Sequence, residues 1–146
     1  MTSSSWLFPL LLIAAAALVA ESVRQLRRRW TLVKVEGRSM EPSLKDGGEV
    51  LAKRTRRIAV GDVVVVAAPD PALGWAEVRR AKAPWWIKRV AAGPGDPIPD
   101  GALPGGGGTV PAGHYYLLSD NPDGEDSRRH GPCPEQMIFG TMVHGF

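Results

Sequence analysis

Hydrophobic positions divide the chain into two parts with different patterns. Residues 6–20 form an apolar run without a charge, whereas from residue 31 onwards short apolar runs alternate with turn sequences. These short runs have the length and the composition of β-strands. The expected strands are residues 31–36, 49–53, 62–68, 75–80, 85–92, 114–118 and 137–144. The pattern therefore predicts a mostly β core that follows an N-terminal apolar segment.

The composition supports a β-rich fold with many turns. The chain of 146 residues contains 17 glycines and 13 prolines, which favour turns and leave little room for long helices. This length is enough for one domain and a short accessory segment. We expect a membrane anchor with a basic juxtamembrane segment at residues 1–30 and one domain at residues 31–146.

The apolar run of residues 6–20 is short of the roughly 20 residues that cross a bilayer. Its flanking residues can supply the difference, with Trp6 and Trp30 as interfacial anchors. A cleaved signal peptide and a buried core helix are the alternatives. Because no Lys or Arg precedes the apolar run, the basic start of a signal peptide is missing, and we favour a retained anchor.

Basic residues are concentrated directly after the apolar run and again near residue 55. The formal net charge is +3 with a pI of about 9.4. No aromatic residues interleave with the second cluster, so membrane lipid is the expected partner and nucleic acid is not. By the positive-inside rule, the arginines after the apolar run favour a cytoplasmic C-terminal domain, but this rule is a bias, and long domains translocate largely regardless of flanking charge. The two clusters are Arg24, Arg27, Arg28 and Arg29, and then Lys53, Arg54, Arg56 and Arg57.

Ser39 lies in a turn that could present its hydroxyl as a nucleophile. Residues 37–44 read GRSMEPSL and follow a strand-like run, with Gly37 before the serine and Pro42 after it. Serines in turns are common, so this position indicates catalysis only if a base lies nearby in the fold. Lysine can be that base when its ammonium group is desolvated.

Lys88 is the candidate base because it interrupts an apolar strand. Strand alternation places Trp86, Lys88 and Val90 on one face and Arg89 on the other. In water only about 1 lysine in 2,500 is neutral at pH 7, so a lysine base needs a lowered pKa, which burial supplies. The alternative is a lysine at a strand edge with its amine in solvent.

Residues 119–131 are rich in acids but do not fit a metal site. With Gly124 as the sixth residue of a calcium loop, the twelfth would be His130 instead of glutamate. The three histidines also lack the spacing of a zinc ligand pair. No metal or cofactor is predicted. Asp126 and Arg128 are expected to form a supporting ion pair. Cys133, the only cysteine, lies between prolines and is expected to be unreactive.

Four segments in this order resemble the type I signal peptidase family of membrane-bound Ser/Lys endopeptidases. They are residues 37–44 (GRSMEPSL), 61–66 (GDVVVV), 88–96 (KRVAAGPGD) and 113–121 (GHYYLLSDN) together with 126–131 (DSRRHG). The resemblance implies a serine protease, a hydrolase, with Ser39 as nucleophile and Lys88 as general base. It also implies a signal-peptidase-like β core at the membrane surface. Substrates would be precursor proteins, bound as an extended strand and cleaved after small residues.

The chain departs from the family pattern at three positions. Some members carry serine at the position of Gly37, where its hydroxyl helps to form the oxyanion hole, so here that role falls to backbone N–H groups, chiefly that of Ser39. The family usually has serine at the position of Gly124, where it steadies the lysine, and glycine at that of Ser119. These two changes alter the surroundings of Lys88, in which Asp126 and Arg128 also take part.

The interval between Gly93 and Gly113 is too short for the second β domain of larger members. The chain is therefore similar to the minimal mitochondrial inner-membrane proteases and to proteases that mature nickel-type superoxide dismutase. We expect a single-pass membrane protease that cleaves signal peptides or similar N-terminal extensions, with its catalytic domain on the extracytoplasmic side. The alternatives are a dedicated maturation protease for one precursor and a non-catalytic, membrane-tethered binding module.

Overall fold

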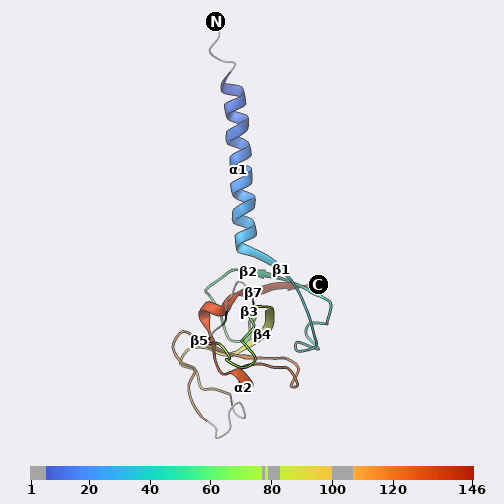
Figure 1. The fold of residues 1–146 in the computed structure, drawn as a ribbon, viewed down its shortest axis with the longest axis vertical. Helices are drawn as coiled ribbons and strands as arrows, with labels where there is room; N and C mark the ends of the chain where they lie inside the picture. The colour runs from blue at the N-terminus through green and yellow to red at the C-terminus, as the bar shows by residue number, and fades with distance from the viewer. Residues whose placement is uncertain (1–5, 77, 79–82, 100–106) are drawn as a thin grey trace.

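A long N-terminal helix leads into a curled β domain (Figure 1). The computed structural model describes residues 6–76, 78, 83–99 and 107–146. In chain order its elements are α1 (Leu7–Arg29), β1 (Trp30–Lys34), β2 (Glu49–Lys53), β3 (Val63–Ala67), β4 (Trp85–Ala92), β5 (His114–Leu118), α2 (Ser127–His130), β6 (Cys133–Pro134), the 3₁₀ helix η1 (Glu135–Met137) and β7 (Ile138–Gly145). The predicted mostly β core behind an apolar helix is confirmed.

All the strands join one antiparallel sheet in the order β1-β2-β7-β3-β4-β5-β6. The central strand β3 is buried at every position, which explains its uninterrupted run of valines. Val64 and Val66 pack into one hydrophobic cluster, and Val63 and Val65 pack into another. The curled sheet therefore has a core on each of its two faces.

Most of the expected strands are present within one or two residues of their predicted ends. The strand expected at residues 75–80 is wrong where the structure describes it, because Trp75 lies in a turn and Val78 is irregular. Residues 77, 79 and 80 of that prediction lie outside the described residues. Trp75 packs against the core from this turn, and its indole N–H donates to the Gly131 carbonyl at 3.2 Å. The apolar residues there cover the sheet instead of extending it.

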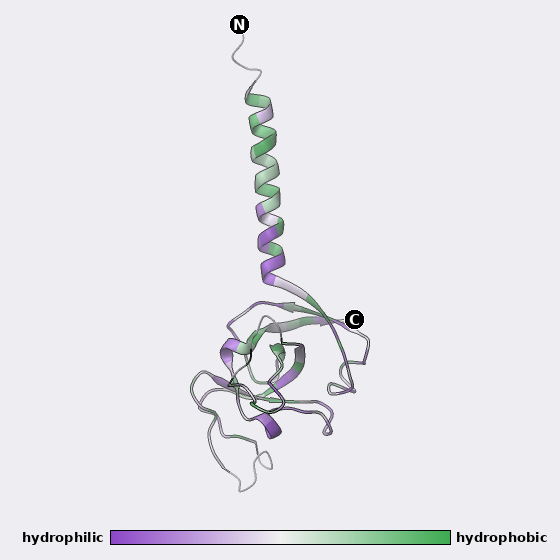
Figure 2. Ribbon diagram, in the orientation of Figure 1, coloured by the Kyte–Doolittle hydropathy of each residue, from purple (hydrophilic) through white to green (hydrophobic). Residues whose placement is uncertain are grey.

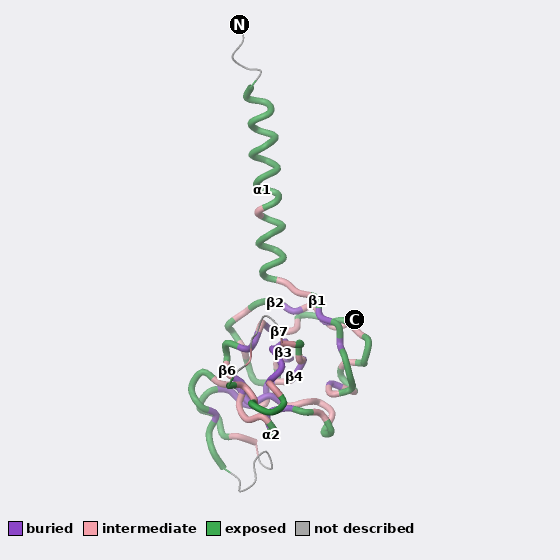
Figure 3. The backbone as a smooth tube through the Cα atoms, in the orientation of Figure 1, coloured by how far each residue is buried: buried purple, intermediate pink, exposed green. Residues whose placement is uncertain are grey.

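Helix α1 has the length and composition of a membrane-spanning segment. Its 23 residues reach about 35 Å, against about 30 Å for the hydrocarbon core of a bilayer. None of its residues is buried, so the alternative of a buried core helix is wrong (Figure 3). Hydropathy changes along the helix, from apolar at its free end to polar where it meets the domain (Figure 2). A membrane anchor and a signal sequence both fit this helix.

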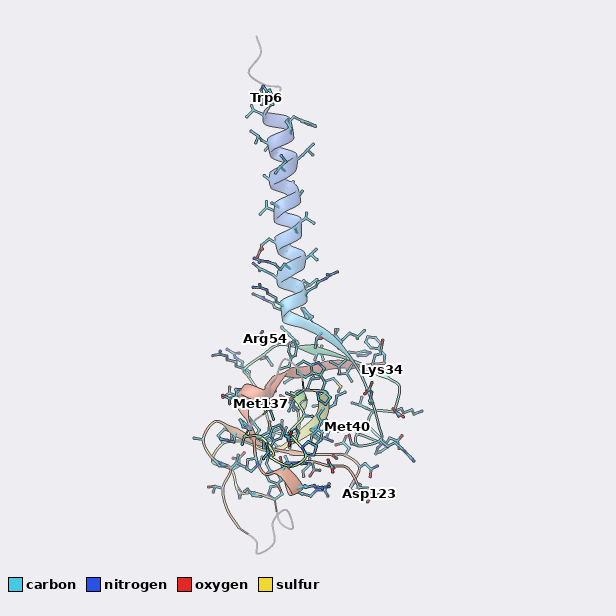
Figure 4. The ribbon with its side chains drawn as sticks, in the orientation of Figure 1. Trp6, Lys34, Met40, Arg54, Asp123 and Met137 are labelled. Atoms are coloured by element: carbon cyan, nitrogen blue, oxygen red, sulfur yellow. The ribbon has the colours of Figure 1, made fainter. Side chains whose placement is uncertain are left out.

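The end of α1 is joined to the β domain by a backbone hydrogen bond. The last turn carries Arg27, Arg28 and Arg29, where positive charge complements the helix dipole. The Arg54 N–H donates to the carbonyl of Arg29 at 2.7 Å, which brings the second basic cluster to the foot of the helix (Figure 4). Both predicted clusters thus meet at the junction between helix and β domain.

Candidate active site

A tight turn after β1 carries Ser39. Gly37 has φ +83, a conformation that favours glycine, and its N–H donates to Asp46 Oδ1 at 2.9 Å. Met40, with only 1% of its surface exposed, anchors the next position of the turn in the core. The side chain of Ser39 is half-buried. The glycine and the buried methionine together hold the serine at the rim of the domain.

Asn121 fixes this turn from the opposite side of the site. Its backbone N–H donates to the Ser39 carbonyl at 2.9 Å, and its side-chain amide donates to the Arg38 carbonyl at 3.0 Å. Residues 119–126 follow β5, whereas Ser39 follows β1, so these bonds join two distant parts of the sequence. The serine is therefore held by its main chain, which leaves its hydroxyl available for chemistry.

Lys88 lies in the middle of β4 with only 3% of its surface exposed. Its ammonium nitrogen is 4.7 Å from the centre of the Trp86 ring and 3.0 Å from Ser119 Oγ. Arg89 points to the other face, where it forms a two-pronged ion pair with Asp120 at 2.7 Å. The predicted alternation is confirmed. A lysine at a strand edge would keep its amine in solvent, so that alternative is wrong.

Burial lowers the pKa of Lys88 from 10.5 to about 8. The nearby carboxylates of Asp126 and Glu125 act in the opposite direction, and the charge of Arg128 lowers the pKa further. With a pKa of about 8, about one lysine in ten is neutral at pH 7, against about 1 in 2,500 for a solvated lysine. Lys88 is thus in an environment that makes a neutral amine available near physiological pH.

Ser39 and Lys88 both line a pocket of about 230 Å³. The segment after β1 forms one wall, and the first half of β4, from Trp85, forms the other. Gly124 lies against the serine, because a β-carbon at this position would stand 3.0 Å from Ser39 Cβ. A larger cavity of about 610 Å³ lies elsewhere, beside Arg54 and His114, and neither member of the Ser/Lys pair lines it.

Asp126 organises the residues behind the pocket. Its carboxylate, which is 2% exposed, accepts hydrogen bonds from the Arg128 side chain at 2.9 and 2.7 Å and from the Ser119 N–H at 2.8 Å. It also caps α2 by accepting the Arg128 N–H at 3.0 Å. Burial alone would raise its pKa, but these hydrogen bonds outweigh burial and lower the pKa below the ordinary value. The predicted Asp126–Arg128 pair is confirmed.

Sequence reasoning did not foresee the contacts made by Ser119 and Asn121. Both residues belong to the last of the four family segments, which was the available signal for them. Cys133 is wholly buried in the core, and burial raises the pKa of its thiol, so the thiolate is disfavoured. The position of Cys133 agrees with its predicted lack of reactivity.

Comparison with known families identifies the chain. The family model described as signal peptidase, peptidase S26, matches residues 4–100 and 100–145, which is nearly the whole sequence. No curated protein matches the chain. The match runs through the turn of Ser39, through the strand of Lys88 and through the segment of Asp126. The chain belongs to the signal peptidase family, peptidase S26, whose members are protein-cleaving hydrolases.

Proposed function

We propose that this chain is a membrane-anchored serine endopeptidase with a catalytic dyad of Ser39 and Lys88. It removes signal peptides or similar N-terminal extensions from precursor proteins, and it cuts after small residues. The observation that supports this most strongly is the buried Lys88, which has a lowered pKa and lines the same pocket as Ser39. Residues 1–30 serve as the anchor and juxtamembrane segment, and residues 31–146 as the catalytic domain.

The reaction follows from the properties of the two side chains. Neutral Lys88 takes the proton of the Ser39 hydroxyl as Ser39 Oγ bonds to the scissile carbonyl carbon. The protonated lysine then gives this proton to the departing amine, and an acyl-enzyme ester remains on Ser39. A water molecule gives a proton to Lys88 and attacks the ester, and the released serine recovers its proton from the lysine.

The backbone N–H of Ser39 is available for the oxyanion hole. Within the described part of the chain this N–H donates to no other atom. Its neighbour Gly37 uses its own N–H to bind Asp46. A preorganised N–H that points at the developing oxyanion stabilises the transition state without further reorganisation. We assign the Ser39 N–H to this role, and Gly37 to shaping the turn that presents it.

The two walls of the pocket can bind an extended peptide. In the described residues, Trp85 to Lys88 pair with β3 on one side, and pairing with β5 begins only at Arg89. The pocket lies between this half of β4 and the segment after β1. A substrate strand inserted there gains main-chain hydrogen bonds, and the small pocket volume selects small side chains.

The cleavage rate is expected to rise with pH through about pH 8, since the free enzyme must lose a proton from Lys88. The pKa is lowered in the folded state, so the unfolded chain binds this proton more tightly. Folding stability should therefore also increase between about pH 8 and pH 10.5. The measurement is kcat/KM for a peptide substrate in detergent.

The matched control for this profile is Lys88→Arg, because arginine keeps the positive charge but cannot lose its proton in this range. We expect no activity from it at any pH. A wild-type rate that stays flat from about pH 6 to about pH 10 would count against a lysine base.

Membrane orientation is a separate proposal. We propose that the N-terminus faces the cytoplasm and that residues 31–146 lie outside, because exported precursors emerge there and long domains translocate largely regardless of flanking charge. The arginines at the foot of α1 then contact anionic headgroups of the outer leaflet. A C-terminal fusion after Phe146 to a reporter that is active only in an oxidising compartment should be active. An intact, expressed but inactive fusion would contradict this orientation.

A narrower function is the second candidate: maturation of one precursor, such as a nickel-type superoxide dismutase. The short connection between β4 and β5 supports it, because it gives the chain the minimal form that resembles proteases that mature nickel-type superoxide dismutase. Comparing the N-termini of exported proteins with and without the enzyme distinguishes the two. Loss of processing in many proteins supports the general function, and loss in one protein supports the narrower function.

A further inference from the structure

The hydroxyl of Ser119 is in direct contact with the amine of Lys88. Ser119 Oγ lies 3.0 Å from Lys88 Nζ, and it donates to the Glu125 carbonyl at 3.3 Å. The backbone of Ser119 is fixed at the same time, since its N–H donates to Asp126 Oδ2 at 2.8 Å. Ser119 therefore links the candidate base to the buried carboxylate behind it.

The direction of these bonds matters for a neutral lysine. A hydroxyl has one proton, and that of Ser119 is directed to the Glu125 carbonyl. Towards Lys88, Ser119 Oγ can then only accept, so it binds an N–H of the amine. The lone pair of the neutral amine stays free of this contact. A hydroxyl that donated to Lys88 would instead occupy the lone pair that must take the Ser39 proton.

Gly124 makes room for this hydroxyl. A β-carbon at position 124 would overlap Ser119 Oγ and would stand 2.6 Å from Ser119 Cβ and 3.0 Å from Ser39 Cβ. A side chain at 124 and the present side chain at 119 therefore exclude each other. Since the 124 β-carbon would overlap the hydroxyl that binds Lys88, we infer that a serine hydroxyl at 124 could reach Lys88 if residue 119 were glycine.

We propose that Ser119 is the positioning residue that orients Lys88 towards Ser39, and that Gly124 is glycine because Ser119 carries the hydroxyl. This inference rests on the proposed Ser/Lys protease function. Where family members supply a hydroxyl from position 124, this chain supplies it from position 119. Ser119 and Gly124 thus act as one unit, and a substitution at only one of the two positions disturbs the position of Lys88.

The first test is Ser119→Ala, measured as kcat, KM and the pH profile of peptide cleavage by the full-length protein in detergent. We expect kcat to fall by about 10- to 100-fold with little change in KM, because the base is misaligned while the substrate pocket is intact. The rise of activity with pH should move to lower pH, because Ser119 Oγ bonds more strongly to charged than to neutral lysine, and its loss lowers the pKa of Lys88. Ser22→Ala on α1, far from the pocket, should leave kcat, KM and the pH profile unchanged.

The second test exchanges the two residues. Gly124→Ser alone should lower both the melting temperature and the activity because of the overlap with Ser119. Ser119→Gly alone should lose activity in the same way as Ser119→Ala. The double variant Ser119→Gly/Gly124→Ser removes the overlap and restores a hydroxyl. We expect it to be at least about 10-fold more active than Ser119→Gly.

Two results would overturn the inference. One is a Ser119→Ala enzyme with wild-type kcat and an unchanged pH profile. The other is a double variant that melts at the wild-type temperature but is no more active than Ser119→Gly. Lys88→Ala separates these results from failure of the proposed function. If Lys88→Ala remains active, the dyad itself is wrong. If Lys88→Ala is inactive while Ser119→Ala is fully active, only the role of Ser119 is wrong.

Discussion

Replacing Ser39 or Lys88 by alanine is expected to lower peptide cleavage by about 10⁴-fold or more, with the domain still folded. In the proposed mechanism Ser39 Oγ forms the bond to the substrate, and Lys88 takes the proton whose removal makes this bond possible, so neither residue can work alone. The double variant should therefore be about as inactive as either single variant. The measurement is kcat/KM for each purified variant in detergent, with circular dichroism to verify folding.

Matched controls for both substitutions lie in or just after the turn of Ser39. Ser43→Ala removes another hydroxyl from the same turn, and Lys45→Ala removes an exposed lysine just after it. Both should retain most of the wild-type activity. Near-normal cleavage by Ser39→Ala would instead favour a different nucleophile, and a wild-type protein that cleaves no peptide in detergent or lipid would favour the non-catalytic binding module.

Replacing Asp126 by alanine should have the largest effect on stability. Its buried carboxylate accepts both the Arg128 side chain and the Ser119 N–H, and it caps α2. Removing one partner of a buried pair leaves its hydrogen-bonding groups unsatisfied, so the free energy of unfolding should fall by about 3 kcal/mol. Arg128 is partly exposed and can turn to solvent, which keeps the loss near the lower end of the range for buried pairs.

This variant should also lose activity beyond its loss of stability. The Ser119 backbone is held by Asp126, so the contact between Ser119 and Lys88 loosens with it. Denaturant unfolding measures the loss of stability, and kcat, measured where the variant is fully folded, measures the loss of activity. Asp123→Asn, an exposed neighbour in the same loop, is the control and should change both by little. Equal stability of Asp126→Ala and wild type would contradict the supporting role assigned to Asp126.

Much of the sheet could be predicted because its strands have clear local patterns. The run of valines in β3 and the lysine within apolar β4 are visible in the sequence, and both strands are where the pattern placed them. The strand predicted near Trp75 was wrong, because apolar residues that cover a sheet have the same composition as residues that form a strand of it. Tertiary packing decides between these two outcomes.

The site could be predicted in part for a similar reason. Ser39 and Lys88 are each marked by their own surroundings in the sequence, a glycine turn and an apolar strand. The relation between Ser119 and Gly124 could not be predicted in this way, because it depends on a steric conflict between two positions of a folded loop. The sequence shows that both residues depart from the family pattern, but only the structure shows that side chains at both positions would overlap.

The most direct test of the Ser/Lys mechanism is to capture the acyl-enzyme. A peptide ester with a small residue before the scissile bond is mixed with the full-length protein, quenched in acid and analysed by mass spectrometry. We predict an adduct with the mass of the acyl fragment, located on Ser39, absent from Ser39→Ala and strongly reduced in Lys88→Ala. Continued cleavage by Ser39→Ala, or an adduct on another residue that persists in that variant, would contradict the mechanism.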